Sequence, residues 1–144
     1  MKNLMMVCCL WCCTLAQAGA QWFNVMGDAV DESVNTIEVD PTPVSITGET
    51  RIMRVRVSRS QECVNCDGVA YRSFVSDVLF DCPQDVARYL SIDYYRLPVW
   101  KGEPFLRQVY PQTEPSMMQF RDVEPDSYRR ILRAACHTST ITNN

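Results

Sequence analysis

Short apolar segments separated by turn residues dominate the chain after residue 21. The clearest is residues 51–58, where Met53, Val55 and Val57 share one face and the intervening arginines share the other. A period of two with charge on one side is typical of a half-buried antiparallel strand. Gly48 stands just before this segment and can take the positive φ of a tight turn, so we expect a hairpin into it.

Two longer segments, residues 71–82 and 86–96, flank the turn sequence CPQD. Pro83 favours a turn there because its ring fixes φ and it cannot donate to a sheet ladder. Strict alternation along the second segment places Tyr89 and Tyr95 on the face opposite the aliphatic one. We therefore predict that these two segments form the longest hairpin of the protein.

Five prolines punctuate residues 98–125, which excludes a central strand and predicts ordered loop with a short edge strand near residues 105–110. The helix pattern comes last. Pro125 suits the first helical turn. An apolar stripe at i, i+3, i+4 and i+7 then follows, formed by Tyr128, Ile131, Leu132 and Ala135.

The order of these elements determines the predicted fold class. Two further strand-like segments, residues 22–25 and 34–41, precede the alternating one. The chain is predicted to be α+β, an antiparallel sheet of about five to six strands with one C-terminal helix packed on it. Residues 21–137 would form this single domain, and the polar residues 138–144 a disordered tail.

The N-terminus has the features of a secretory signal peptide. Lys2 precedes an apolar run at residues 4–16, which is shorter than the ~20 residues that span a bilayer, and small residues follow. We expect residues 1–20 to be removed by cleavage after Ala20, or alternatively after Ala18. No later stretch is apolar for long enough to span a membrane. The mature chain is therefore predicted to be exported, to the periplasm or the outer surface of a Gram-negative bacterium.

Charge narrows the range of partners. Of the 14 Lys and Arg residues Lys2 is lost with the signal, leaving 13 against 17 acidic residues and a net charge of −4. An acidic chain is a poor candidate for binding nucleic acid, because that affinity rests on neutralising phosphates. We expect no nucleic-acid partner.

Four of the eight cysteines remain after cleavage, and an exported chain usually pairs an even set. Cys82 ends a predicted strand on its apolar face, and Cys136 ends the predicted helix beside its apolar stripe. If the helix packs on that face, a disulfide joins the two and closes a loop that removes roughly 4 kcal/mol of unfolded-state freedom. Two free buried thiols are the alternative.

Cys63 and Cys66 form a C-x-x-C pair for which three roles are open. A catalytic dithiol needs a helix N-terminus or a nearby cation to lower the thiol pKa, but Glu62 and Asp67 flank this pair and a strand follows it. A zinc site would need further ligands, for which the candidates are Cys82, Cys136 and His137. We favour the third role, a local disulfide that clips the loop between two strands.

Other catalytic chemistry has little support in the sequence. The single histidine, His137, excludes an HExxH zinc site and multi-histidine metal centres, and there is no GxSxG motif or phosphate loop. Four carboxylates fit solvent-facing or turn positions of the long hairpin: Asp77, Asp81, Asp85 and Asp93. We predict a non-enzymatic protein without catalytic residues, cofactor or metal site.

A binding surface is better supported. Aromatic residues and arginines dominate the energy of protein interfaces. Such residues gather beside the outer face of the predicted hairpin: Tyr89, Tyr95, Trp100 and Phe105, with Arg96, Lys101 and Arg107 at the rim. The alternative is that these aromatics fold back as a second small core beneath the proline-rich loop.

The order of segments from Trp22 to His137 resembles the surface-adhesin protein E-like family of small exported proteins from Gram-negative bacteria. The segments that carry the resemblance are WF (22–23), IEVDPTPVSI (37–46), RIMRVRV (51–57), YRSFVSDVLFDC (71–82), YLSIDYYR (89–96) and ILRAACH (131–137). The resemblance implies a sheet packed against a helix, a Cys82–Cys136 bridge, an envelope or surface location and, for some members, adhesion to host matrix proteins. The CVNCDG segment departs from the family pattern.

The sequence therefore predicts an exported adhesin-like domain that binds a protein partner, such as a host matrix protein, at the bacterial envelope or surface. A periplasmic structural or assembly factor is the alternative, followed by a thiol-disulfide protein that uses Cys63 and Cys66. An exposed sheet edge also leaves room for a homodimer.

Overall fold

The computed structural model describes residues 21–114, 116–119 and 126–137. Its elements in chain order are β1 (Phe23–Met26), β2 (Thr36–Val39), β3 (Ser45–Thr47), β4 (Thr50–Val64), β5 (Ala70–Asp81), β6 (Val86–Tyr95), the 3₁₀ helix η1 (Pro98–Trp100), β7 (Leu106–Val109), β8 (Ser116–Met117) and α1 (Ser127–Cys136). The predicted signal peptide and tail lie outside the described residues.

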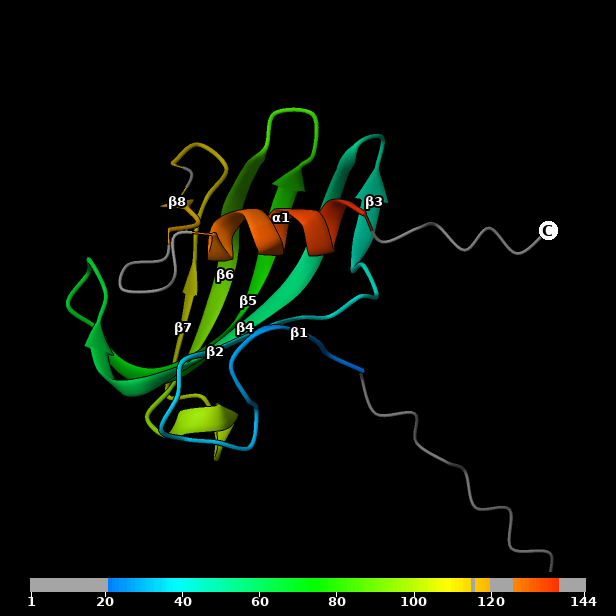
Figure 1. Cartoon of the computed structure of the whole chain (residues 1–144). Helices are drawn as coiled ribbons and strands as arrows, with labels where there is room; N and C mark the ends of the chain where they lie inside the picture. The colour runs from blue at the N-terminus through cyan, green and yellow to red at the C-terminus, as the bar shows by residue number, and fades with distance from the viewer. Residues whose placement is uncertain (1–20, 115, 120–125, 138–144) are drawn as a thin grey trace, which may run out of the picture.

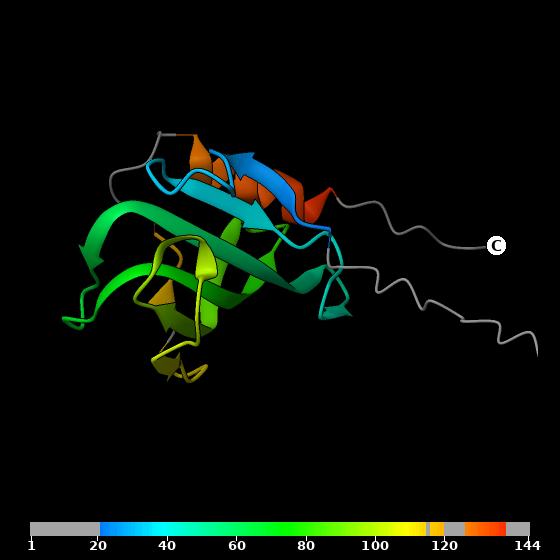
Figure 2. The same cartoon turned by 90° about the horizontal axis from the view of Figure 1, so that it is seen from below.

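The strands form one antiparallel sheet with the order β1-β2-β4-β5-β6-β7 (Figure 1). Two short strands pair off this path, β3 with β4 and β8 with β6. Helix α1 lies across one face of the sheet, beside β1 and β2, while the β4–β5 hairpin reaches away from them (Figure 2). The predicted α+β class with one C-terminal helix is confirmed. Within the described residues, no helix combines the length and the apolar character needed to cross a membrane.

The longest hairpin is β4–β5, so the prediction that it would be β5–β6 is wrong. The alternating segment does form a strand, but β4 continues through the polar residues up to Val64. Its pairing with β5 shifts register between Ser58 and Cys63, and it ends in a tight turn before Ala70. The polar composition of residues 58–62 concealed this extension, because Ser58 and Arg59 are buried polar residues and Gln61 and Glu62 are exposed, which leaves no apolar alternation to mark a strand.

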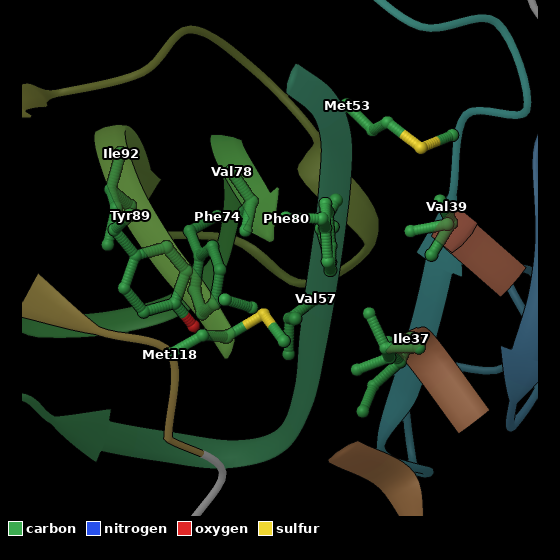
Figure 3. Close-up of a cluster of buried hydrophobic side chains, with 14 of the residues drawn as sticks. Ile37, Val39, Met53, Val57, Phe74, Val78, Phe80, Tyr89, Ile92 and Met118 are labelled. Carbon is green, nitrogen blue, oxygen red and sulfur yellow. The ribbon is translucent and has the colours of Figure 1, made fainter. Parts of the chain in front are cut away.

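The core lies on the inner face of the sheet, beneath α1. Met53, Val55 and Val57 are each fully buried there, which confirms the face predicted from their alternation. Phe74 and Val78 of β5 stand opposite Val57 and Met53 and complete the inner face. Figure 3 shows how these side chains meet, with Tyr89 of β6 beside Phe74.

A β-bulge in β6 changes which of its side chains are buried. Asp77 pairs with Ser91 but Val78 pairs with Tyr89, so Leu90 is an extra residue without a partner on β5. Because of the extra residue, the side chains of β6 that precede Leu90 point to the opposite faces from those that a strict alternation predicts. Tyr89 therefore points to the inner face and is 8% exposed, which contradicts its predicted place on the outer face.

Helix α1 packs through the predicted stripe. Ile131, Leu132 and Ala135 are buried, and Tyr128 is half-buried at the start of the helix. The Tyr128 hydroxyl accepts a hydrogen bond from the Ala87 N–H (3.2 Å) and donates to the Asp85 carbonyl (3.1 Å), which ties α1 to the β5–β6 turn.

A disulfide joins the C-terminal end of α1 to the end of β5. Cys82 and Cys136 are bonded, with their Cα atoms 5.8 Å apart. The predicted pairing is confirmed, and it locks the helix layer onto the sheet at one end.

Candidate partner-binding surface

The outer face of the sheet, opposite α1, carries a row of charged side chains in register. Glu38 of β2 stands opposite Arg56 of β4, and Asp93 of β6 stands opposite Arg107 of β7. Arg56 Nε donates to Glu38 Oε2 at 2.6 Å, and an Arg107 guanidinium nitrogen lies 2.7 Å from Asp93 Oδ2. Opposite charges directly across strands stabilise the pairing of β2 with β4 and of β6 with β7.

Arg56 is the most enclosed cation of this row. Its guanidinium carbon lies 4.1 Å from the centroid of the Trp22 ring and 4.0 Å from that of Trp100, so two indoles contact one cation. The Glu38 side chain beside it is only 6% exposed. Cation–π contact and a charge-assisted hydrogen bond together compensate the burial of this charge pair. The sequence does not predict this cluster, because no local motif specifies the strand register that brings Trp22, Glu38 and Trp100 to Arg56.

Trp100 is held in place by a strained turn. Val99 and Trp100 have φ values of 47° and 56°, a left-handed conformation that is costly for a β-branched residue. Hydroxyl groups of the outer face hold the strained turn: Ser58 Oγ accepts from the Val99 N–H (2.9 Å) and Ser73 Oγ from the Trp100 N–H (3.1 Å). The indole N–H of Trp100 donates to the Phe74 carbonyl (2.9 Å), which fixes the ring. The position of this indole is therefore set before any partner arrives.

Five other predicted patch residues surround this turn and the adjoining edge of the sheet. Tyr95 and Arg107 lie on the outer-face positions of β6 and β7. Phe105 precedes β7, is 37% exposed and carries the Arg96 guanidinium 4.3 Å above its ring. Lys101 follows Trp100 and forms an ion pair with Glu32. The structure thus gathers Tyr95, Trp100, Lys101, Phe105 and Arg107, which we call the outer patch, on and beside the outer face.

Tyr89 belongs instead to a cluster of four tyrosines on the inner face. Tyr71 and Tyr94 have ring centroids 5.2 Å apart, and Tyr89 and Tyr110 have centroids 6.5 Å apart. They line a hollow of about 590 Å³ beneath the β4–β5 hairpin. Since Tyr89 is buried among them, it contributes packing and not an exposed contact surface.

Burial raises the pKa of all four phenols above the ordinary value, most strongly for Tyr89 and Tyr94. A folded-state pKa above the unfolded-state value means that the neutral phenol is favoured by folding. The buried phenols therefore contribute fully to the free energy of unfolding below the unfolded-state pKa of about 10. This contribution is lost as the pH rises beyond that value.

Alkaline titration is therefore expected to couple ionisation of this cluster to unfolding of the protein. Phenolate absorbance at 295 nm and far-ultraviolet circular dichroism, recorded together above pH 10, should show the cluster ionising within the unfolding transition. Replacing Tyr89 with phenylalanine removes one of the groups and should move that transition to higher pH. Complete phenolate formation near pH 10 with the fold intact would contradict this account.

The model of the family described as "Surface-adhesin protein E" matches residues 22–137. The chain belongs to this family. A search of the curated proteins finds no match, and a search of the solved structures finds none either.

Membership of the surface-adhesin protein E family indicates an exported, adhesin-like protein and suggests a non-enzymatic role. The match begins at Trp22 and ends at His137, so it covers every described strand, the helix, and both cysteines of the disulfide. It therefore spans both the outer patch and the inner face described above.

The C-x-x-C segment, residues 63–66, lies at the end of β4 and the start of the β4–β5 turn. Cys63 and Cys66 are both free thiols, so the local clip that the sequence predicted is not formed in the structure. Asn65 organises the turn instead, because its side-chain oxygen accepts from the N–H groups of Asp67 (2.9 Å) and Val69 (2.8 Å). Its amide nitrogen donates to the Tyr94 hydroxyl (2.9 Å) and anchors the turn to the tyrosine cluster.

The same geometry bears on the two other roles considered for the thiols. A strand leads into the turn and a strand leaves it, so within the described part of the chain no helix begins directly after Cys63 or Cys66, as one does in a thioredoxin-like site. Among the described residues, no group of three or more potential metal ligands comes together. Neither a thioredoxin-like site nor a zinc site is assembled there by the described residues.

Proposed function

We propose that this protein is an exported adhesin-like domain that binds a protein partner, such as a host matrix protein, through the outer patch. The observation that carries the proposal is the gathering of Tyr95, Trp100, Phe105 and Arg107 around a rigid turn on and beside the face that α1 leaves uncovered. Membership of the surface-adhesin protein E family supports the adhesin-like role.

The chemistry of the outer patch suits a protein partner. Aromatic rings and arginine are enriched where interfaces gain most of their energy, and each of these residue types offers apolar area together with a hydrogen-bonding or cationic group. The hydrogen bonds that hold Val99 and Trp100 in their strained turn mean that little ordering remains to be done on binding. Arg107 and Lys101 already have acidic neighbours, so their role at an interface would be orientation as much as attraction.

The proposal predicts that Phe105→Ala combined with Arg107→Ala weakens partner binding at least tenfold, a loss of about 1.4 kcal/mol or more. Binding of the purified mature protein to a panel of immobilised extracellular-matrix proteins, measured by biolayer interferometry, would test this. Trp100 is left unchanged because it also covers Arg56. The matched control is Arg129→Ala, an exposed arginine on α1, in the layer opposite the outer patch.

Two results would contradict the proposal. One is binding that the double variant leaves unchanged, or that falls equally in the Arg129 control. The other is complete protection of the outer patch from added protease in intact cells, since a partner outside the cell could not then reach it. That second result would favour a periplasmic structural or assembly factor.

A further inference from the structure

An apolar cleft lies between β1 and the C-terminal half of α1, on the opposite layer from the outer patch. Its volume is about 510 Å³, within the range of small-ligand sites. The residues that line it come from the N-terminal strands and from the helix: Phe23, Asn24, Val25, Val39, Pro41, Arg130, Arg133, Ala134 and His137.

The floor of the cleft is apolar and incompletely covered. Val39 stands opposite Phe23 on the inner face and is 1% exposed, whereas Phe23 itself is 56% exposed. The lining includes one amide side chain, that of Asn24. Its nitrogen already donates a hydrogen bond to the Gly27 carbonyl (2.8 Å). An occupant of the floor would gain from burying apolar surface but would find few side-chain hydrogen-bond partners there.

The rim of the cleft is basic. Arg130 and Arg133 of α1 and the C-cap residue His137 line it, and among the described lining residues none carries a carboxylate. The carbonyl groups at this helix end, which would repel an anion, are partly engaged. Arg51 donates to the Ala135 carbonyl (3.2 Å) and the His137 N–H to the Arg133 carbonyl (2.9 Å).

We propose that this cleft binds a single-chain fatty-acid anion, with the acyl chain on the Phe23–Val25–Val39 floor and the carboxylate against Arg133 and His137. The charge of the rim selects a negative head group, and the apolar floor selects a chain that needs no hydrogen bonds. A peptide segment fits less well, because its backbone N–H and C=O groups would lose water over the apolar floor without side-chain partners in return. The site is independent of the proposed adhesin function, since it lies in the other layer.

Dodecanoate and dodecyltrimethylammonium, kept below their critical micelle concentrations, are the probes that test the site on the mature protein. Isothermal titration calorimetry should show saturable binding of dodecanoate at least tenfold tighter than that of the cationic amphiphile with the same chain. Decanoate should bind about fifteenfold more weakly than dodecanoate, since it lacks two CH₂ groups and each buried CH₂ contributes about fourfold in affinity. Amide chemical-shift changes should be confined to β1, to the end of β2 with the start of the connection to β3, and to residues 130–137.

Arg133→Ala is expected to weaken dodecanoate binding about tenfold, while the matched Arg129→Ala variant, an exposed arginine outside the cleft, should bind as the parent does. Both residues are exposed, so both variants should keep the fold. Equal affinity for the two head groups, an equal loss in both variants, or chemical-shift changes spread over the whole apolar surface would overturn the proposal. None of these outcomes bears on matrix-protein binding by the outer patch, so the two proposals succeed or fail separately.

Discussion

Replacing both Cys82 and Cys136 with serine is expected to lower the free energy of unfolding by about 4 kcal/mol. The two residues are 54 apart in sequence, and the bond removes the entropy of that open loop from the unfolded chain. The loss is large for a small domain whose total stability is about 5–15 kcal/mol. Equilibrium denaturation in urea measures it, and the serine variant should also show the steeper urea dependence of a more expanded unfolded state.

The matched control is the Cys63→Ser/Cys66→Ser variant, which removes two thiols without opening a loop. Cys66 is exposed and Cys63 half-buried, so a loss of about 1 kcal/mol or less is expected. If the control were as destabilised as the Cys82/Cys136 variant, the disulfide would not be the element that holds α1 to the sheet.

Arg56→Met is expected to cost about 3–5 kcal/mol, because it leaves the Glu38 carboxylate buried without its cation. The methionine keeps most of the apolar stem between Trp22 and Trp100 but cannot donate a hydrogen bond. Thermal and urea unfolding of the variant measure the loss. Adding Glu38→Gln to Arg56→Met removes the uncompensated charge, so the double variant should lose less than the sum of the two single changes.

Arg54→Met provides the comparison on the same strand. Arg54 also faces outwards, but its side chain is 55% exposed and its nearest contact with Asp77 is 3.7 Å. A surface pair of this kind contributes about 0–1 kcal/mol, so this variant should remain close to the parent. Equal losses for Arg54→Met and Arg56→Met would mean that the two indoles and Glu38 add nothing to the environment of Arg56.

Local pattern predicted the strands well where one face is apolar and the other polar. The alternation of residues 51–58 identified β4 and its buried face, and the stripe on residues 128–135 identified α1. The hydrophobic pattern predicted the wrong face where burial along a strand does not follow a period of two. The extra Leu90 in β6 moved Tyr89 from the outer to the inner face, and a bulge of this kind depends on the pairing of two strands.

The candidate site was foreseen in part. Composition alone suggested that the aromatics and cations near residues 95–107 form one surface, and the structure places Tyr95, Trp100, Lys101, Phe105 and Arg107 on and beside the outer face. The enclosure of Arg56 by two indoles and the apolar cleft beneath α1 were not foreseen. Each is built from segments far apart in the chain, which only strand register and helix docking bring together.

The sequence by itself predicted the α+β class and a C-terminal helix packed on the sheet, because both follow from periodicity. It indicated the pairing of Cys82 with Cys136 only on the condition that the helix covers the apolar face of the strand, and the structure met that condition. Only the tertiary structure decided the role of the CVNCDG turn. There, Asn65 satisfies the backbone donors and reaches Tyr94, so the turn is ordered by hydrogen bonds and the two thiols remain free. The physical reason is that the Asn65 side-chain oxygen can stabilise the turn by hydrogen bonds to two backbone N–H groups, without a covalent bond. These three groups come close together only in the folded hairpin.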